Sequence, residues 1–461
     1  MKKILLLVIL VISTFELSAQ LKHALRDAHG RHVIGRGFVV VTNNTFFSED
    51  DYTRMVRLGA NYQVVRLELG KLGDFPGASL DPNYLLKLDT LVQLGANAGM
   101  NTVFKMTVYG VKEFSWEKFW VNEDKVHEKY LDAWKVVWNR YKDISAVVGY
   151  DIVNEPRKLA MDISYDDLTN QYLIPYYQRL IDTSQKINPD KYCLVQSIFM
   201  NKGEAINGNQ YAEFSSPIKR KKILFAPHIY QNQKELVKPT LLRFEKESKI
   251  LKAPVFIGEW GFPTFSRTDS TMSGRLGQLN YMDFYIRTAE LFDSLGINTI
   301  KAWFSGNPRM QNFLPGGPST WAIFTDKHAV GTAERKYITD IIARPYPQSI
   351  AGDIQSFKYD FATRSLDVFI KSDNSKGVSK IFVGANRHYP DGFTVVINDS
   401  FILCHNPLKT TGLDVVKMDI GSNPADVCWN SARQQLMIQK WPVDNNDVHL
   451  RIIPGVKDYK E

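Results

Sequence analysis

Residues 147–159 read VVGYDIVNEPRKL, an apolar and β-branched run that ends abruptly in Asn154, Glu155 and Pro156. Short runs of Val and Ile without strict polar alternation are typical of strands buried on both faces of a parallel sheet. A proline disfavours the α region for the residue before it, so we expect Glu155 to be extended at the rim of the strand. An amide and a carboxylate at this place indicate that the end of the strand belongs to a functional site.

Seven further short apolar runs rich in β-branched residues lie before and after this stretch, with helical patterns between them. Residues 126–141 place apolar side chains at three- and four-residue spacing, and helices are also expected over 241–251 and 280–296. Gly296 is a natural stop for the last of them. Such alternation predicts an α/β fold of the (β/α)8 TIM barrel type. The expected strands span residues 35–42, 61–69, 101–109, 146–154, 191–199, 222–230, 253–261 and 297–305.

The pattern of apolar and polar residues changes after residue 344. The stretch RPYPQSIAG (344–352) holds two prolines and a glycine, which mark a domain boundary. Beyond it, apolar residues recur with a period of two between turns rich in Asn, Asp, Gly and Ser. We therefore expect a barrel over residues 20–344 and a small antiparallel β-sandwich over 345–461. The expected sandwich strands span residues 365–372, 380–386, 393–399, 435–441 and 448–454.

The first 19 residues have the pattern of a secretory signal peptide. Lys2 and Lys3 precede an apolar run over 4–12, and Ala19 is a small residue at the expected cleavage point. The run is short for a membrane span, although an uncleaved anchor is the alternative. This segment predicts an exported protein, whether secreted, periplasmic or held at the cell surface.

Charge and cysteine content exclude several other classes of protein. The chain of 461 residues has 57 Lys and Arg against 49 Asp and Glu, giving a formal charge of +8, and these charges are scattered. Because the only tight basic run is 219–222, we expect no nucleic-acid partner and at most weak attraction to an anionic membrane. The three cysteines lack the spacing of a metal site, and the sequence leaves open whether Cys404 and Cys428 pair.

Polar residues gather at the carboxyl ends of the expected barrel strands, where the chemistry of such barrels takes place. Taken singly, each has an ordinary structural explanation, such as a surface charge or a satisfied core histidine. Their joint placement at one end of the barrel is what indicates a site. The candidates are Arg66, Asn154, Glu155, His228, Tyr230, Glu259 and Trp303, with Glu68, Lys105 and Tyr109 as possible lining residues.

Two carboxylates that face one site are what glycosidic cleavage requires. One donates a proton to the leaving oxygen, and the other attacks the anomeric carbon or activates water. Glu155 and Glu259 would then need different environments, so that one stays protonated near neutral pH and the other ionised. We expect Arg66, His228 and Tyr230 to keep Glu259 ionised. Trp303, with Trp260 as a second candidate, would offer a flat face to a sugar ring.

Six short motifs occur in this sequence in the same order as in a known family. They are RGF at 36–38, VVRLEL at 64–69, GYDIVNEP at 149–156, APHIY at 226–230, FIGEWG at 256–261 and AWFS at 302–305. In these residues the sequence resembles glycoside hydrolase family 5, whose members are retaining glycosidases built on a (β/α)8 barrel. We expect no metal and no organic cofactor, because proton transfer and carboxylate attack suffice for this chemistry.

The same resemblance implies a role for each site residue. Glu155 matches the acid/base, and Glu259 matches the nucleophile. Asn154 matches the residue that binds the sugar 2-hydroxyl, and Trp303 matches the floor beneath the cleaved sugar, with a cis peptide expected at Trp303–Phe304. The residues that match supports of the nucleophile are Arg66, His228 and Tyr230.

Within the family, GYDIVNEP and the bridge into a sandwich resemble endoglycoceramidases and related glycolipid hydrolases. One departure concerns strand three, where Lys105 and Thr107 stand in place of an expected Asp and His. A lipid substrate would need an apolar rim, for which the aromatic stretches 43–47, 113–120 and 309–317 are candidates. Local packing of these stretches on the barrel is the alternative.

These features predict a secreted retaining β-glycosidase that acts on a glycolipid, with transient contact with a membrane surface or micelles. An endo-β-glucanase or mannanase acting on a polysaccharide is the alternative within the enzymes. A carbohydrate-binding protein that has lost catalysis is a second alternative. The exact sugar and the oligomeric state stay open.

Overall fold

A computed structural model describes residues 21–456 except 22, 43–46, 76, 109, 113, 202–203, 205–209, 231–233, 262–274, 305–322, 324–333, 335, 400, 406–413 and 418–425. The expected signal peptide, Tyr109, the stretch 309–317 and most of the stretch 43–47 therefore lie outside the described residues. In the described part, no helix has the length and apolar character needed to cross a membrane.

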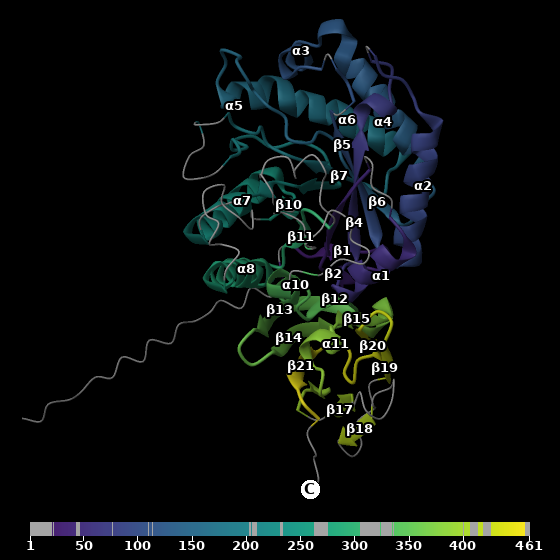
Figure 1. The fold of residues 1–461 in the computed structure, drawn as a ribbon, viewed down its shortest axis with the longest axis vertical. Coiled ribbons are helices and arrows are strands. Elements are labelled where there is room, and N and C mark those ends of the chain that lie inside the picture. The colour runs from purple at the N-terminus through teal and green to yellow at the C-terminus, as the bar shows by residue number, and fades with distance from the viewer. Residues whose placement is uncertain are drawn as a thin grey trace, which may run out of the picture.

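The eight strands expected from the sequence form a closed parallel barrel, shown in the upper part of Figure 1. The sixth expected strand is split at Ala226 and Pro227, so that its halves stand at opposite ends of the sheet order β8-β7-β6-β5-β4-β3-β11-β10-β9. Phe225 bridges in parallel to Val255, which joins the two ends. The strands are β3 (Arg36–Val41), β4 (Tyr62–Glu68), β5 (Asn101–Thr107), β6 (Val147–Asp151), β7 (Tyr192–Val195), β8 (Ile223–Phe225), β9 (His228–Ile229), β10 (Phe256–Trp260) and β11 (Asn298–Lys301).

Helices cover the outside of the barrel (Figure 1). Within α4 (Val126–Tyr141), Trp134 and Trp138 stack at 5.6 Å and both meet Tyr150 of β6 edge-on. This confirms the apolar stripe read from the spacing. The other helices are α1 (Glu49–Arg57), α2 (Pro82–Asn97), α3 (Trp116–Trp120), α5 (Tyr165–Leu168), α6 (Ile174–Ile187), α7 (Val237–Leu251), α8 (Arg275–Leu295) and α10 (Lys336–Ile342).

The aromatic stretch 113–120 does not form an exposed rim. Trp116, Phe119 and Trp120 are at most 7% exposed, and Phe119 packs edge-on against Tyr176 of α6 at 5.0 Å. The expectation of a lipid-facing surface here is wrong, and the alternative of local packing holds. The reason is that α3 folds its aromatic side chains inward onto α4 and α6.

The carboxyl-terminal part supplies ten strands to two antiparallel sheets, each of which has six strands in the described chain, as the period of two predicted. In β14 (Ser365–Ser372), buried residues alternate with more exposed ones, so one face of the strand packs inward. Phe393 and Trp429, from different sheets, have ring centroids 5.4 Å apart, which makes the pair a sandwich. The further strands are β12 (Tyr346–Ile350), β13 (Gly352–Asp360), β15 (Ser379–Phe382), β16 (Phe393–Ile397), β17 (Phe401–His405), β18 (Asp414–Lys417), β19 (Asp426–Asn430), β20 (Gln435–Lys440) and β21 (Asp447–Pro454), with the short helix α11 (Ala385–His388).

The start of the described chain belongs to one of these sheets. Strands β1 (Leu25–Arg26) and β2 (His32–Val33) extend the sheet through antiparallel pairing of β2 with β12. The sequence analysis placed these residues with the barrel and gave no sign of this pairing. The segment is too short and too polar to show a strand pattern of its own.

A buried ion cluster joins the barrel to the sandwich. Asp293 at the end of α8 accepts hydrogen bonds from Arg344 at 2.6 and 2.7 Å and from Arg36 of β3 at 2.7 Å. Burial and the neighbouring Arg344 lower the pKa of Arg36 to about 10. Tyr346 of β12 packs under the Arg36 guanidinium and donates to the carbonyl of Gly59 at 2.7 Å. Because these buried groups hydrogen-bond to one another, they stabilise the junction.

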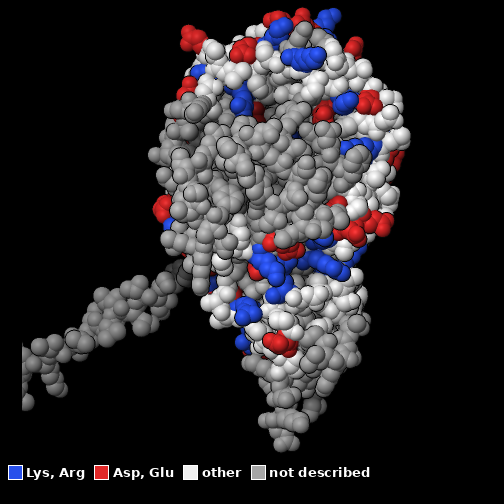
Figure 2. Space-filling view, viewed as in Figure 1, with Lys and Arg blue, Asp and Glu red and all other residues white. Residues whose placement is uncertain are grey.

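The surface charge is mixed in sign. Figure 2 shows basic and acidic side chains together near the junction of barrel and sandwich. In the basic run 219–222, Arg220 is paired with Asp182 of α6, and Lys222 lies 4.0 Å from Asp190. Cys428 is a free, exposed cysteine, so the pairing that the sequence left open is not formed.

Candidate active site

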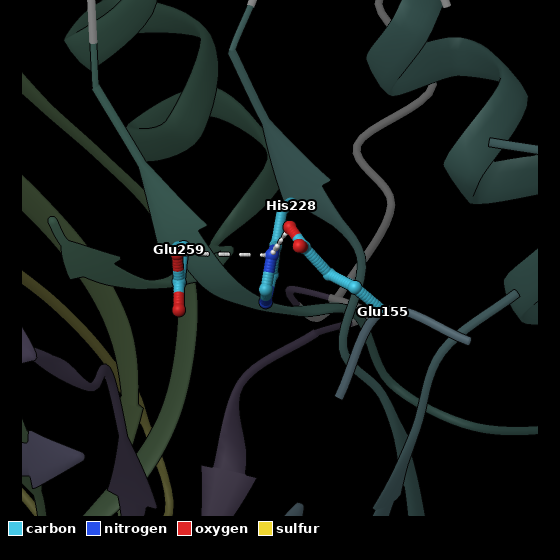
Figure 3. A group of neighbouring side chains, drawn as sticks. All are labelled: Glu155, His228 and Glu259. Carbon is cyan, nitrogen blue, oxygen red and sulfur yellow. Dashed lines mark hydrogen bonds and ion pairs between the residues drawn. The ribbon is translucent and has the colours of Figure 1, made fainter. Parts of the chain in front are cut away.

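The two glutamates expected from the sequence meet at the carboxyl end of the barrel. Glu259 lies within β10, directly beside His228 of β9 in the parallel register. Glu155 follows β6 by four residues, and its side chain reaches the same imidazole. One oxygen of each carboxylate and one ring nitrogen of His228 lie within 4.8 Å of one another, as Figure 3 shows.

Glu259 is almost fully buried and is contacted on both oxygens. Lys105 of β5 donates to Oε1 at 2.9 Å, and the hydroxyl of Tyr230 donates to Oε2. Nδ1 of His228 is 3.8 Å from Oε2. Burial acts to raise the pKa of this carboxyl, but the charges of Lys105, His228 and Arg66 and the hydrogen bond from Tyr230 lower it to about 2. Glu259 is therefore ionised at neutral pH.

Glu155 is held more loosely at the opposite side of the imidazole. Its Oε1 lies 2.9 Å from Nδ1 of His228 and accepts from Tyr211 at 3.2 Å. The Arg157 guanidinium is 3.8 Å from Oε2, and 22% of the Glu155 side chain is exposed. These contacts leave one edge of the carboxyl group open to a ligand.

The backbone of Glu155 corrects one expectation. Its φ of 46° lies in the left-handed region, so the residue before Pro156 is not extended. Two hydrogen bonds hold the backbone that leads into this turn: the Glu155 amide donates to Oε1 of Gln196 at 3.1 Å, and Trp134 donates to the carbonyl of Ile152 at 3.0 Å. Such a conformation costs about 1–2 kcal/mol, which these neighbours must offset.

The titration of Glu155 also differs from expectation. Burial and the charge on Glu259 act to raise its pKa, but the hydrogen bond and charge of His228, together with Arg157, bring it below the ordinary value. The sequence predicts one carboxyl group that stays protonated near neutral pH. The two carboxyl groups do have different environments, yet both pKa values are shifted downward.

Three further expected residues line the same space. The Arg66 guanidinium lies 5.1 Å from the centre of the Trp303 ring, and both side chains are buried. Nε1 of Trp303 and Oδ1 of Asn154 are buried without a hydrogen-bond partner among the described residues. Two such unsatisfied atoms beside the carboxylates are positions for ligand hydroxyls.

Two details around Trp303 differ from the sequence-based expectations. The cis peptide precedes this residue, at Ala302–Trp303, instead of following it. Trp260 is not a second platform: it points outward from β10 and packs on Tyr285 and Phe292 of α8, at 5.4 and 5.3 Å. The reason is the alternation of the strand, which sends the neighbour of Glu259 to the opposite face.

Sequence reasoning missed or understated four residues of the site. Lys105, left as a possible lining residue, contacts Glu259 directly. Asp151 is fully buried 3.7 Å from Lys105, and its pKa is raised to about 6, chiefly by burial. Gln196 joins Asp151 to the Glu155 turn, and Tyr211 reaches Glu155 from a segment with no strand or helix pattern. A signal for Asp151 was available, because an acidic residue inside the apolar run 147–153 is unusual.

Glu155, His228 and Glu259 have donor atoms close enough to ligate a metal ion. Such a site is poorly suited to a cation, however, because the ammonium group of Lys105 already lies 2.9 Å from Glu259. A second cation would have to displace it or bear its repulsion. The arrangement instead suits proton transfer and carboxylate attack on one bound group.

Comparison with known families matches this geometry. The family model described as Cellulase (glycosyl hydrolase family 5) matches residues 27–302. The chain belongs to glycosyl hydrolase family 5. A second model, the glycoside hydrolase family 5 C-terminal domain, matches residues 344–452. This family 5 chain is thus a glycoside hydrolase of the retaining type, as its sequence motifs implied.

Solved structures similar to this family 5 chain share both of its domains. Endo-glycoceramidase II from Rhodococcus sp. has a TM-score of 0.68 at 18% identity, covering 94% of this chain and 100% of its own. An endogalactoceramidase has a TM-score of 0.65 at 15% identity, covering 93% and 98%. Cryptococcus neoformans sterylglucosidase 1 has a TM-score of 0.63 at 10% identity, covering 94% of this chain and 96% of its own. No curated protein sequence matches the chain.

Proposed function

We propose that this protein cleaves the β-glycosidic bond of a glycolipid by a double displacement between Glu155 and Glu259. The observation that carries the mechanism is the approach of the two carboxylates to within 4.8 Å. Retaining enzymes hold these groups about 5–5.5 Å apart, whereas inverting enzymes leave room for a water at about 6.5–9.5 Å. The distance favours direct attack by one carboxylate.

In the first step, an oxygen of Glu259 attacks the anomeric carbon as the bond to the leaving oxygen breaks. Glu155 gives its proton to that oxygen, so the aglycone departs as a neutral alcohol. In the second step, Glu155 takes a proton from water, the hydroxide part of which attacks the anomeric carbon and releases Glu259. The ionised state of Glu259 and its two hydrogen bonds suit the nucleophile.

The remaining residues would position the sugar. Among the described residues, Oδ1 of Asn154 and Nε1 of Trp303 have no hydrogen-bond partner, so Asn154 would accept from the 2-hydroxyl and Trp303 would offer its ring and Nε1. Arg66 lies against this ring and lowers the pKa of Glu259 by its charge. These three side chains together would form a pocket for the sugar that is transferred to Glu259.

A lipid aglycone is supported by similarity over the whole length of the chain. The Rhodococcus enzyme has been solved as a lactosyl-enzyme intermediate and as a ganglioside GM3 complex. The sterylglucosidase also takes its name from a lipid glycoside. All three relatives carry both the barrel and the region that corresponds to the sandwich, with at least 93% of this chain covered.

A polysaccharide substrate is the second candidate, favoured by the description of the matching family model as a cellulase. The two are separated by assaying a fluorescent glucosylceramide in detergent micelles against a soluble β-glucan. Release of labelled ceramide with no polymer cleavage is the expected result. Cleavage of the polymer alone would contradict the lipid substrate, and a lack of turnover on every β-glycoside would favour a binding protein.

Export is part of this proposal and is supported by the pattern of residues 1–19. Glycolipids are components of membranes, and an exported hydrolase meets them at a surface. Expression of the full chain in a bacterial host, followed by mass spectrometry of the mature protein, tests the signal. We expect the first 19 residues to be absent; an intact amino terminus would contradict cleavage.

A further inference from the structure

Lys105 is the most unusual residue of the site, because it is a lysine with no solvent exposure inside a barrel. Its Nζ lies 2.9 Å from Oε1 of Glu259, 3.2 Å from the carbonyl oxygen of Gly258 and 3.0 Å from Nε2 of His228. Oδ2 of Asp151 lies 3.7 Å from the same nitrogen. An ammonium group has three hydrogens and no lone pair, so each of the three neighbours must accept one hydrogen bond.

The third of these hydrogen bonds determines the protonation of His228. Since Nε2 accepts from Lys105, it carries no hydrogen, and the proton of the neutral ring is on Nδ1. Nδ1 then donates to Oε1 of Glu155 at 2.9 Å. A doubly protonated ring would direct a hydrogen from Nε2 at the ammonium group of Lys105. Lys105 therefore opposes a charge on His228.

Both catalytic carboxyl groups of the proposed mechanism are affected in this way. Lys105 is the largest of the charges that lower the pKa of Glu259. A charge on His228 is among the influences that lower the pKa of Glu155. The charge of His228 also lowers the pKa of Glu259, so with a neutral ring the ammonium group of Lys105, 2.9 Å from Oε1 of Glu259, is the charge that distinguishes the two carboxyl groups. The other titratable and charged groups that face these residues are Arg66, Asp151, Arg157, Tyr211 and Tyr230.

We propose that Lys105 is a positioning residue that holds Glu259 ionised and fixes the tautomer of His228, so that a single ammonium group assigns the two glutamates their different roles. This inference rests on the function proposed above. It is not a sugar-binding role, because all three hydrogens of Lys105 are used within the protein. Nor is Thr107 free to bind sugar through its hydrogen, since it donates to the carbonyl of Leu67 at 2.6 Å.

The first test measures the tautomer directly and needs no substrate. Protein with 15N-labelled histidine is examined by NMR, and the signal of His228 is assigned by its loss in His228→Asn. We expect an unprotonated Nε2 and a protonated Nδ1 from pH 5 to 8. In Lys105→Met, which removes the charge at similar length, the proton should move to Nε2 or the ring should become cationic. A protonated Nε2 in the unchanged protein would overturn the inference.

The second test follows the nucleophile. A 2-deoxy-2-fluoro-β-glycoside with a good leaving group labels Glu259 without help from Glu155, so its rate reports the ionisation of Glu259. In Lys105→Met we expect the acidic limb of the labelling rate to move up by one pH unit or more. With glycolipid, kcat should fall and KM should change less than threefold. An unchanged pH profile would overturn the inference.

Controls separate this inference from loss of folding and from failure of the proposed function. Lys105→Met with Asp151→Asn removes one charge of each sign and should fold where the single variant does not. Lys301→Met removes the other buried lysine of the described barrel strands and should leave the His228 signal unchanged. If the unchanged protein cleaves no β-glycoside, the proposed function fails while the NMR test still decides the tautomer. If the unchanged protein and Lys105→Met are labelled at the same rate, the role of Lys105 is overturned and the proposed function is not.

Discussion

Glu259 is a residue of strand β10, whereas Glu155 belongs to the loop that follows β6. The first has 7% of its side chain exposed and hydrogen-bond donors on both oxygens. The second has 22% of its side chain exposed, a left-handed backbone, and an Oε2 whose partner among the described residues is the Arg157 guanidinium at 3.8 Å. A group that attacks one carbon benefits from a fixed position, and a group that moves protons between two oxygens benefits from freedom. Four predictions test this contrast.

The largest effect is expected from Glu259→Gln, which keeps the shape but cannot form a glycosyl ester. The kcat for an aryl β-glycoside should fall on the order of 10⁴-fold or more, whatever the leaving group. Steady-state rates with a good and a poor leaving group measure this. Glu247→Gln is the matched control, since Glu247 is a buried glutamate of α7 outside the site. Comparable losses in both variants would mean that folding, and not chemistry, was affected.

Glu155→Gln should have a smaller effect that depends on the leaving group. Loss of a general acid costs about 10²–10⁴-fold, and the cost disappears when the leaving group needs no proton. We expect a loss of about 10³-fold with an alkyl glycoside and slow deglycosylation with a dinitrophenyl glycoside, relieved by azide. Rates that fall equally for both substrates would remove Glu155 from the acid role and leave Glu259 untouched.

The features that could and could not be predicted from the sequence divide in the same way between Glu259 and Glu155. The strands and Glu259 were predictable, because Glu259 lies in an apolar run and its register follows from the barrel. The conformation of Glu155 was not, because it is set by Gln196 and Trp134, which are distant in sequence. Lys105 was visible but unexplained, since a buried lysine makes sense only once its partners on β9 and β10 are known. Strands β1 and β2 gave no periodic signal at all.

A third prediction concerns Asp151, whose raised pKa has the opposite sign to that of Glu259. Because Asp151 binds its proton more tightly when folded, its contribution to stability is present below the unfolded pKa of about 3.8 and is lost as pH rises through about 6. The Asp151→Asn variant has no such titrating group, so it does not lose this contribution to stability as pH rises. Its free energy of unfolding relative to the unchanged protein should increase by about 1–3 kcal/mol between pH 4 and pH 7. Denaturant titrations at both values measure it; a difference independent of pH would contradict the raised pKa.

The smallest effect is expected from Arg157→Gln. Arg157 lowers the pKa of Glu155, but its side chain is 44% exposed and 3.8 Å away, so solvent screens most of its charge. Activity is lost as Glu155 gives up its proton, so the alkaline limb of kcat/KM should move upward by less than about half a pH unit. Lys158→Gln is the control at the next position. A downward shift would contradict the placement of Arg157 beside the acid.

The pairing of β2 with β12 has a consequence for the order in which the molecule is made. His32 accepts a hydrogen bond from the amide of Ile354, 322 positions further along the chain. Strands β1 and β2 pair with each other, but they cannot join the rest of their sheet until β12, in the last quarter of the sequence, has been synthesised. A nascent chain stopped after the barrel would have all eight barrel strands but a loose leading end. Completion of that sheet would be a late step, and it would tie the segment before the barrel to the sandwich.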